Sequence, residues 1–141
     1  MNKLVIILSF SLLYSCAIFG QRSEKKTVEK CGFLPHCVSS VDSRDRFNIK
    51  PLKHNHKSIK EAKKEVLNYL KKQKRVKVEF ENDNYIHVTY ESKLMGYIDD
   101  VEFLFTDNIV HIRSISRIGI SDLGVNRERV EKIRKDIFNE M

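Results

Sequence analysis

The sequence lacks three features: an apolar run long enough to cross a membrane, a Cys-x-x-Cys motif, and any acidic residue at positions 1–15. It has instead Lys3, an uncharged apolar stretch at 4–14, and Leu-Tyr-Ser-Cys at 13–16. This layout is typical of a bacterial lipoprotein signal peptide, so we expect cleavage before Cys16 and acylation of its thiol with chains such as palmitate. Two alternatives remain open, a soluble secreted protein cut near Gly20 and an uncleaved anchor.

The charge balance is basic, and it stays basic when the expected signal peptide is removed. Residues 1–15 contribute only Lys3, so 25 basic and 19 acidic residues remain, a net charge of +6. In an exported domain this excess favours an anionic lipid or cell-wall polymer as partner, and nucleic acid is disfavoured because no base-stacking aromatic motif accompanies the charge. The alternative is an ordinary solvated, lysine-rich surface. The sequence indicates no oligomeric state.

Two cysteines remain once Cys16 is assigned to lipid. Cys31 and Cys37 are separated by five residues, and in an exported chain this spacing predicts a local disulfide. The alternative is a metal site, but the spacing matches no zinc pattern. The histidines that would join such a site are His36, His54 and His56. No motif implies another cofactor.

Apolar periodicity predicts a helix followed by a hairpin. A capping box at 58–61 opens a series of apolar positions at helical spacing that continues to about Gln73. Two runs of alternating apolar residues then flank Asn-Asp-Asn at 82–84, and this pattern predicts pairing of Phe80 with Ile86. The other pairs of this register are Val78 with Val88, Val76 with Tyr90 and Glu79 with His87.

A second hairpin and a final helix complete the predicted elements. The hairpin runs from 98 to 117 around a two-residue turn at 107–108. This turn places Glu102 opposite Arg113, with Asp100 diagonal to both Arg113 and Arg117. Asn126 is then expected to cap a helix whose apolar positions recur at steps of three and four residues. The apolar pairs of the hairpin are Phe105 with Val110 and Phe103 with Ile112, and Val101 lies by Ser114.

These elements predict an α+β domain: a four-stranded antiparallel meander with two helices on one face, preceded by an irregular, disulfide-closed N-terminal segment. The second sheet face is expected to be partly covered, with residues 31–50 as the candidate cover. The expected organisation is a lipoprotein signal peptide at 1–15, a lipidated tether at 16–30 and a single globular domain at 31–141.

A long polar motif, Arg-Ser-x-Ser-Arg-x-Gly-x-Ser-Asp-x-Gly-x-Asn-Arg, occupies 113–127. Together with Cys-x5-Cys-Val-Ser-Ser at 31–40, Ser92 and Asp-Asp-Val-Glu-Phe at 99–103, it resembles the bacterial and plastid family called domain of unknown function 1499. The resemblance covers roughly residues 31–139 and departs from the family pattern at Gly32, often proline there, and at His36, often asparagine. The family has no established activity, so the resemblance implies a domain and a site but no chemistry.

Two functional hypotheses follow from these residues. The first is a non-catalytic binding or accessory module in which arginines and helix-start amides receive a phosphate or carboxylate group; alternatively, the same charges pair internally and fix the last strand to the last helix. The second is a hydrolase that uses Asp100 and Glu102, which share a strand face, as an acid/base pair. A serine nucleophile is disfavoured because no histidine lies within the motif. The candidate network or anion-binding residues are Asp99, Asp100, Glu102, Arg113, Ser114, Ser116, Arg117, Ser121, Asp122, Asn126 and Arg127.

Overall fold

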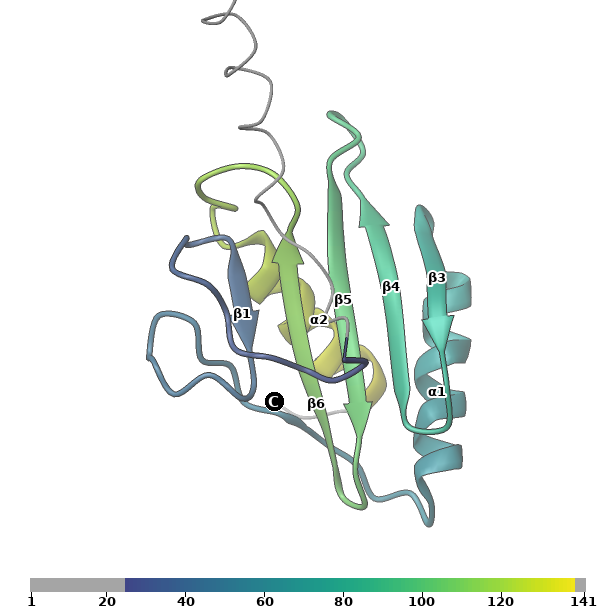
Figure 1. Ribbon diagram of the computed structural model, residues 1–141. Coiled ribbons are helices and arrows are strands. Elements are labelled where there is room, and N and C mark those ends of the chain that lie inside the picture. Colours follow the sequence, from purple (N-terminus) through teal and green to yellow (C-terminus); the bar gives the residue numbers. More distant parts are fainter. Residues whose placement is uncertain (1–24, 139–141) are drawn as a thin grey trace, which may run out of the picture.

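The computed structural model describes residues 25–138, and the expected signal peptide and Cys16 lie outside this range. The described chain has six strands and two helices, with four consecutive strands between the helices (Figure 1). In order, they are β1 (Cys37–Ser39), β2 (Leu52–Lys53), α1 (Ile59–Lys72), β3 (Val76–Glu81), β4 (Tyr85–Glu91), β5 (Ile98–Phe105), β6 (Ile109–Ser116) and α2 (Val125–Phe138).

Helix α1 begins where the capping box predicts. The hydroxyl of Ser58 accepts a hydrogen bond from the backbone N–H of Glu61 at 3.2 Å, which satisfies one donor that has no partner within the helix. Ala62, Val66 and Leu70 then form one buried stripe, because residues three or four apart share a helix face. The helix ends at Lys72. Lys71 and Lys72, in its last turn, interact favourably with the negative end of the helix dipole.

The sheet is antiparallel and has the strand order β1-β6-β5-β4-β3, with β2 also paired to β6. The expected α+β class is therefore confirmed, but the expected number of four strands is wrong. The segment before α1 supplies two short strands that pair with the outer edge of β6, with Val38 opposite Ser114 and Leu52 opposite Val110. Extending the sheet satisfies backbone groups that an edge strand would leave open.

The second hairpin has the predicted register, with Glu102 opposite Arg113 and Phe103 opposite Ile112. The first hairpin has it only in part. Val76 and Val78 pair with Tyr90 and Val88 as expected, but a bulge follows Val78, and Phe80 then pairs with His87. An extra residue in one strand moves the following side chains to the opposite face. The ring of Phe80 consequently lies 6.2 Å from that of Tyr85, centroid to centroid.

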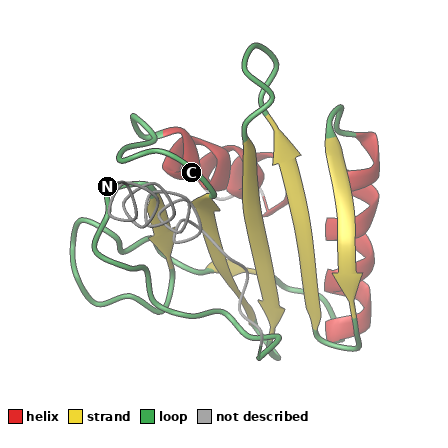
Figure 2. Cartoon of the chain, turned by 45° about the horizontal axis from the view of Figure 1, so that its top comes forward, coloured by secondary structure: helices red, strands yellow, loops and turns green. Residues whose placement is uncertain are grey.

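Both helices pack on one face of the sheet and contact each other there (Figure 2). The core between them is apolar and includes Val66, Phe103, Ile112 and Val130, each with no exposed surface. The opposite face holds Cys31, Cys37 and Phe47, which pack on Ile115 of β6. The segment before β2 thus both extends the sheet and covers part of this second face.

Candidate functional site

The sheet face opposite the helices is buried but polar. Glu102, at the centre of β5, has no exposed surface. The hydroxyl of Tyr85, one strand away, donates to Oε1 of Glu102 at 2.5 Å, and Nε of Arg113 lies 3.4 Å from Oε2. Arg113 is itself only 5% exposed. Glu102 therefore joins β4, β5 and β6 through side chains, in addition to the backbone ladder.

A second ionic group lies beside the first. Nε2 of His87 is 2.7 Å from Oδ1 of Asp100, and Arg117 donates through two guanidinium nitrogens, at 2.8 and 2.9 Å, to the same carboxylate. Burial alone would raise the pKa of Asp100, but the hydrogen bonds from Arg117 and His87 outweigh it and hold that pKa below its ordinary value. Asp100 is therefore ionised at neutral pH although it is 1% exposed.

His87 is a residue that the sequence analysis did not assign to this cluster. The expected first-hairpin register paired it with Glu79, whereas the bulge in β3 leaves it opposite Phe80, and β5 brings it to Asp100. Alternation along β4 was the available signal, because His87 shares a strand face with Tyr85. Glu79 instead accepts a hydrogen bond from the hydroxyl of Thr89 at 2.9 Å.

Residues 25–31 lie across this polar face (Figure 1). Val28 is buried, the carbonyl of Glu29 accepts from the Ser39 hydroxyl at 2.7 Å, and the Glu29 carboxylate lies 3.8 Å from Arg113. Farther out, the Lys26 ammonium is 4.2 Å from the centre of the Phe80 ring. The part of the expected tether that the structure describes thus contacts the domain.

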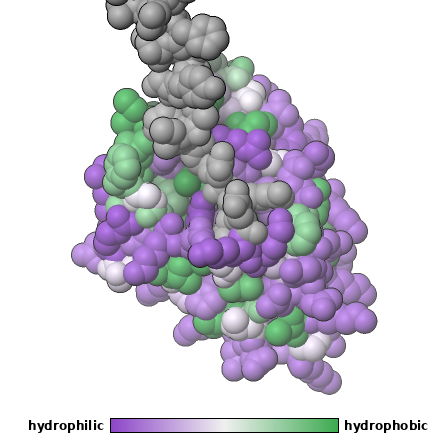
Figure 3. Space-filling model, in the orientation of Figure 1, coloured by the Kyte–Doolittle hydropathy of each residue, from purple (hydrophilic) through white to green (hydrophobic). Residues whose placement is uncertain are grey.

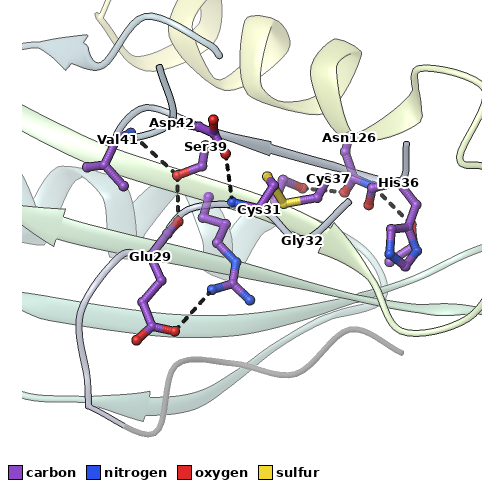
Figure 4. The surroundings of a disulfide bond; sticks show 12 residues. Glu29, Cys31, Gly32, His36, Cys37, Ser39, Val41, Asp42 and Asn126 are labelled. Atoms are coloured by element: carbon purple, nitrogen blue, oxygen red, sulfur yellow. Dashed lines mark hydrogen bonds and ion pairs between the residues drawn. A yellow bond between two sulfur atoms is a disulfide. The ribbon is translucent and has the colours of Figure 1, made fainter. Parts of the chain in front are cut away.

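The predicted disulfide between Cys31 and Cys37 is present (Figure 4). Asp42 holds its first half in place: Oδ2 accepts from the backbone N–H of Cys31 at 2.9 Å, and Arg44 donates both to Asp42 and to the Cys31 carbonyl. The hydrogen bond from Arg44 is the largest of several effects that hold the pKa of Asp42 well below its ordinary value. This arrangement fixes the start of the domain against β6.

A separate polar network joins the end of β6 to the start of α2. Asn126 is at its centre with no exposed surface. Its amide nitrogen donates to the carbonyl of His36, to Ser116 and to Asp122, and its amide oxygen accepts from Ser114 at 2.5 Å (Figure 4 shows Asn126 beside His36). A buried amide that uses both its donor and its acceptor atoms fixes one geometry, so this network is structural.

The expected role of Asn126 as the helix cap is wrong. Helix α2 already includes Asn126, and Asp122 takes the capping role instead. Its carboxylate accepts from the backbone N–H of Gly124 at 3.1 Å and of Asn126 at 3.0 Å. Gly124 has φ of +89°, a conformation that glycine adopts without strain, and it lets the chain turn into the helix.

Arg129 is the second residue that the sequence analysis missed. It donates to Asp99 at 2.5 Å, to Ser114 at 2.9 Å and to the amide oxygen of Asn126 at 2.7 Å. Its guanidinium also lies 4.9 Å from the centre of the Tyr90 ring. Helical spacing is the signal that points to it, since Arg129 is three residues after Asn126.

The candidate residues therefore fall into two buried networks, with two members outside both. Asp100, Glu102, Arg113 and Arg117 lie on the polar sheet face opposite the helices, whereas the Asn126 network lies between β6 and α2. The members of the Asn126 network among the candidates are Asp99, Ser114, Ser116, Asp122 and Asn126. Ser121 is exposed and accepts from Leu123 N–H, and Arg127 donates to the carbonyl of Arg46 at 3.2 Å.

Arg127 lines a surface hollow with a volume of about 810 Å³. The charged residues around this hollow are Lys50, Lys53, Arg127, Arg134 and Glu131. Arg134 is buried and donates to the carbonyls of Lys50 and Pro51, which holds the wall in place. Lys50 and Lys53 are exposed, and among the described residues that line the hollow the basic side chains outnumber the one acidic side chain.

The geometry of Asp100 and Glu102 is relevant to the hydrolase hypothesis. They share a strand face, as expected, but Asp100 is bound by His87 and Arg117 and Glu102 by Tyr85. Both carboxylates are also almost fully buried. A general acid or base must reach substrate, which neither group does in this arrangement.

Within residues 25–138, no group of three or more His, Cys, Asp or Glu side chains is placed to hold a metal ion. In the same range neither helix has the length and apolar composition needed to cross a bilayer.

The fold and its networks define a small α+β domain with a disulfide at its start and a sheet that the helices cover on one face and the N-terminal segment covers in part on the other. A family model described as "Protein of unknown function (DUF1499)" matches residues 27–137, and the chain belongs to this family. The match begins within the segment that crosses the polar face, four residues before the first disulfide cysteine. No curated protein and no solved structure matches the chain.

Proposed function

We propose that the protein is an exported, lipid-anchored module of the bacterial cell envelope that binds an anionic envelope component and catalyses no reaction. The proposed organisation is a signal peptide at 1–15, a lipidated Cys16 with its tether, and the folded domain. Two observations support export: the Leu-Tyr-Ser-Cys sequence at 13–16 and a disulfide, since disulfides persist in oxidising compartments.

The hollow around Arg127 is the observation that supports anion binding. Lys50 and Lys53 approach it from the strand side and Arg127 from α2, against a single carboxylate, Glu131. Because Glu131 accepts from Arg134 at 2.9 Å, the negative charge is already engaged. The guanidinium of Arg127 makes one hydrogen bond among the described residues and has further N–H donors for a phosphate or carboxylate.

Titration with glycerol phosphate, followed by melting temperature and by calorimetry, tests the binding part of the proposal. Arg127→Gln is expected to weaken binding at least about tenfold, because a charge-assisted hydrogen bond contributes about 1.5–3 kcal/mol. Lys64→Gln is the matched control, since Lys64 is exposed on α1 and its loss changes the net charge equally. No binding by the unaltered protein, or an equal loss in both variants, would show that the hollow is not a specific site.

Cys16→Ser tests the anchor. The substitution is expected to release the protein from membranes and to abolish incorporation of labelled palmitate, because the acyl chains supply the apolar area that holds the protein to lipid. The control is the pair Cys31→Ser and Cys37→Ser, which removes the other two cysteines and leaves Cys16. Unchanged membrane fractionation of Cys16→Ser would refute the anchor without affecting the anion site.

No contact among the described residues favours the alternative hydrolase. Its two carboxylates are ion-paired or hydrogen-bonded to neighbouring side chains, and Asp100 keeps a low pKa, the reverse of what a general acid needs.

A further inference from the structure

We propose that one end of the sheet docks onto the lipid bilayer that holds the anchor. Three loops at this end carry the proposed contact: 32–36 before β1, 92–97 between β4 and β5, and 117–124 between β6 and α2 (upper part of Figure 1). These loops and the first residue of α2 contain every large hydrophobic side chain found exposed in residues 25–138. They are Phe33, Leu94, Met95, Tyr97, Ile118, Ile120, Leu123 and Val125, exposed by 46% to 92%.

The antiparallel order brings the three loops together. The chain leaves β4 and β6 at this end and enters β5 and β1 there. Backbone hydrogen bonds then join two of these loops, 32–36 and 117–124: Ser116 N–H, at the end of β6, donates to the carbonyl of His36 at 3.0 Å, and Asp122 N–H to that of Pro35 at 3.3 Å. Hydrophobic surface gathers over this region at the upper left of the space-filling view (Figure 3).

The connections at the opposite end of the sheet are polar. Its connections are Asn-Asp-Asn at 82–84, Thr-Asp-Asn at 106–108 and His-Asn-His-Lys at 54–57. None of the exposed large hydrophobic residues of the described range lies there. Scattered apolar residues are normal on a protein surface, but their confinement to one end indicates contact with an apolar phase.

Charge identifies that phase as a bilayer. The charged residues of the three loops are Lys93, Arg117 and Asp122. The Asp122 carboxylate is occupied by two backbone N–H groups and the side-chain amide of Asn126, whereas Lys93 is exposed. Leucine and isoleucine tips beside a tyrosine and a free cation suit the boundary between acyl chains and anionic headgroups.

The length of the tether also favours a bilayer. This step rests on the proposed lipid anchor. Eight residues lie between Cys16 and Lys25, where the described structure begins, and the nine steps from one to the other span at most about 30 Å. An eight-residue strand such as β5 is about 26 Å long. The anchor therefore keeps the domain within about one strand length of lipid. The loops are then at high effective concentration near the bilayer, so that even a weak apolar contact forms.

The absence of tryptophan from the chain allows a direct test. Leu94→Trp and Leu123→Trp are introduced singly into the lipidated full chain, with Asp107→Trp at the opposite end as the matched control. Each protein is reconstituted into vesicles of phosphatidylethanolamine and phosphatidylglycerol that contain bromine-labelled acyl chains. We expect a blue shift and quenching of the tryptophans at 94 and 123, and neither at 107.

The outcomes separate docking from anchoring. Proteins that float with the vesicles while all three tryptophans stay unquenched would overturn docking and leave the anchor intact. Proteins that fail to float would refute the anchor. A blue shift at 123 that grows with protein concentration before lipid is added would assign this end to a second copy of the chain and overturn the proposal.

A second measurement removes the anchor. Binding of the Cys16→Ser protein to the same vesicles is compared with and without the further substitutions Leu94→Asp and Leu123→Asp. The two changes together are expected to lower the partition coefficient at least tenfold. Each one removes the favourable free energy of transferring a leucine side chain from water into lipid. Equal partitioning of the two proteins would contradict the proposal.

Discussion

At the centre of the sheet, side chains on the two faces are buried by different physical means. On the helix face, Phe103 and Ile112 have no exposed surface and need no specific partner, because burial of apolar area is favourable wherever it occurs. On the other face, Glu102 and Arg113 are just as inaccessible, but each is stable there only beside the other. Side chains on the first face are stable when buried because they are apolar, whereas the charged side chains on the second face are stable when buried only because they are paired.

The largest expected effect comes from removing one charge of a buried pair. Arg113→Ala should lower the free energy of unfolding by about 3–5 kcal/mol, because it leaves Glu102 without its ion pair in the interior. Urea denaturation measures the loss. The control on the same face is Lys77→Ala, whose exposed ion pair with Glu79 should contribute less than about 1 kcal/mol. Equal stability of the two variants would mean that Arg113 is available to a ligand.

Removing both charges tests the comparison more sharply. Glu102→Leu together with Arg113→Met should recover most of the stability lost in Arg113→Ala, since apolar replacement of a buried pair is often neutral or stabilising by about 1–4 kcal/mol. On the helix face, the pair Phe103→Ala and Ile112→Ala should show no such recovery, because two cavities do not compensate for each other. A double variant as unstable as Arg113→Ala would refute the pairing argument.

Loss of the disulfide should have a smaller effect and a local one. Replacing both Cys31 and Cys37 by Ala is expected to cost about 2–3 kcal/mol, because the bridge closes a short loop. Hydrogen exchange should accelerate in β1, which begins at Cys37, more than in α1. Mass spectrometry of the non-reduced protein comes first, since two free thiols at these positions would contradict the disulfide.

The smallest expected effect is a difference in pH dependence. Asp100 has a lower pKa in the folded than in the unfolded chain, so its ionised form stabilises the fold above about pH 4, and that contribution is lost as pH falls toward the folded pKa. The urea midpoint of the protein should therefore fall on acidification more than that of Asp100→Asn. Parallel falls in the two proteins would show that the Asp100 group does not couple folding to protonation.

Much of the apolar framework follows from local sequence. Alternation of Val101, Phe103 and Phe105 with polar residues fixes the face that each presents, and a tight turn at 107–108 fixes their partners. The capping box at Ser58 similarly fixes the start of α1. The two cysteines, close in sequence, predict their own bridge. Each of these features depends on residues that are neighbours along the chain or across one turn.

Local sequence also left several features undecided. The bulge after Val78 turns Phe80 toward Tyr85 instead of the core, and alternation alone does not reveal an inserted residue. The order of the expected elements contained no strand before the first helix, because β1 and β2 are too short to show a period and form only against the edge of β6.

Sequence patterns predict the fold class, the disulfide, the second-hairpin register and the polar character of the segment 113–127. The partners of the polar residues depend on how distant segments pack: Arg129 binds Asp99, His87 binds Asp100, and Asp122 rather than Asn126 caps α2. The two kinds of feature differ in the sequence distance over which they are set. Apolar periodicity is a property of one segment, whereas a buried charge or amide is satisfied by whichever donor or acceptor the packing of distant segments brings within about 3 Å.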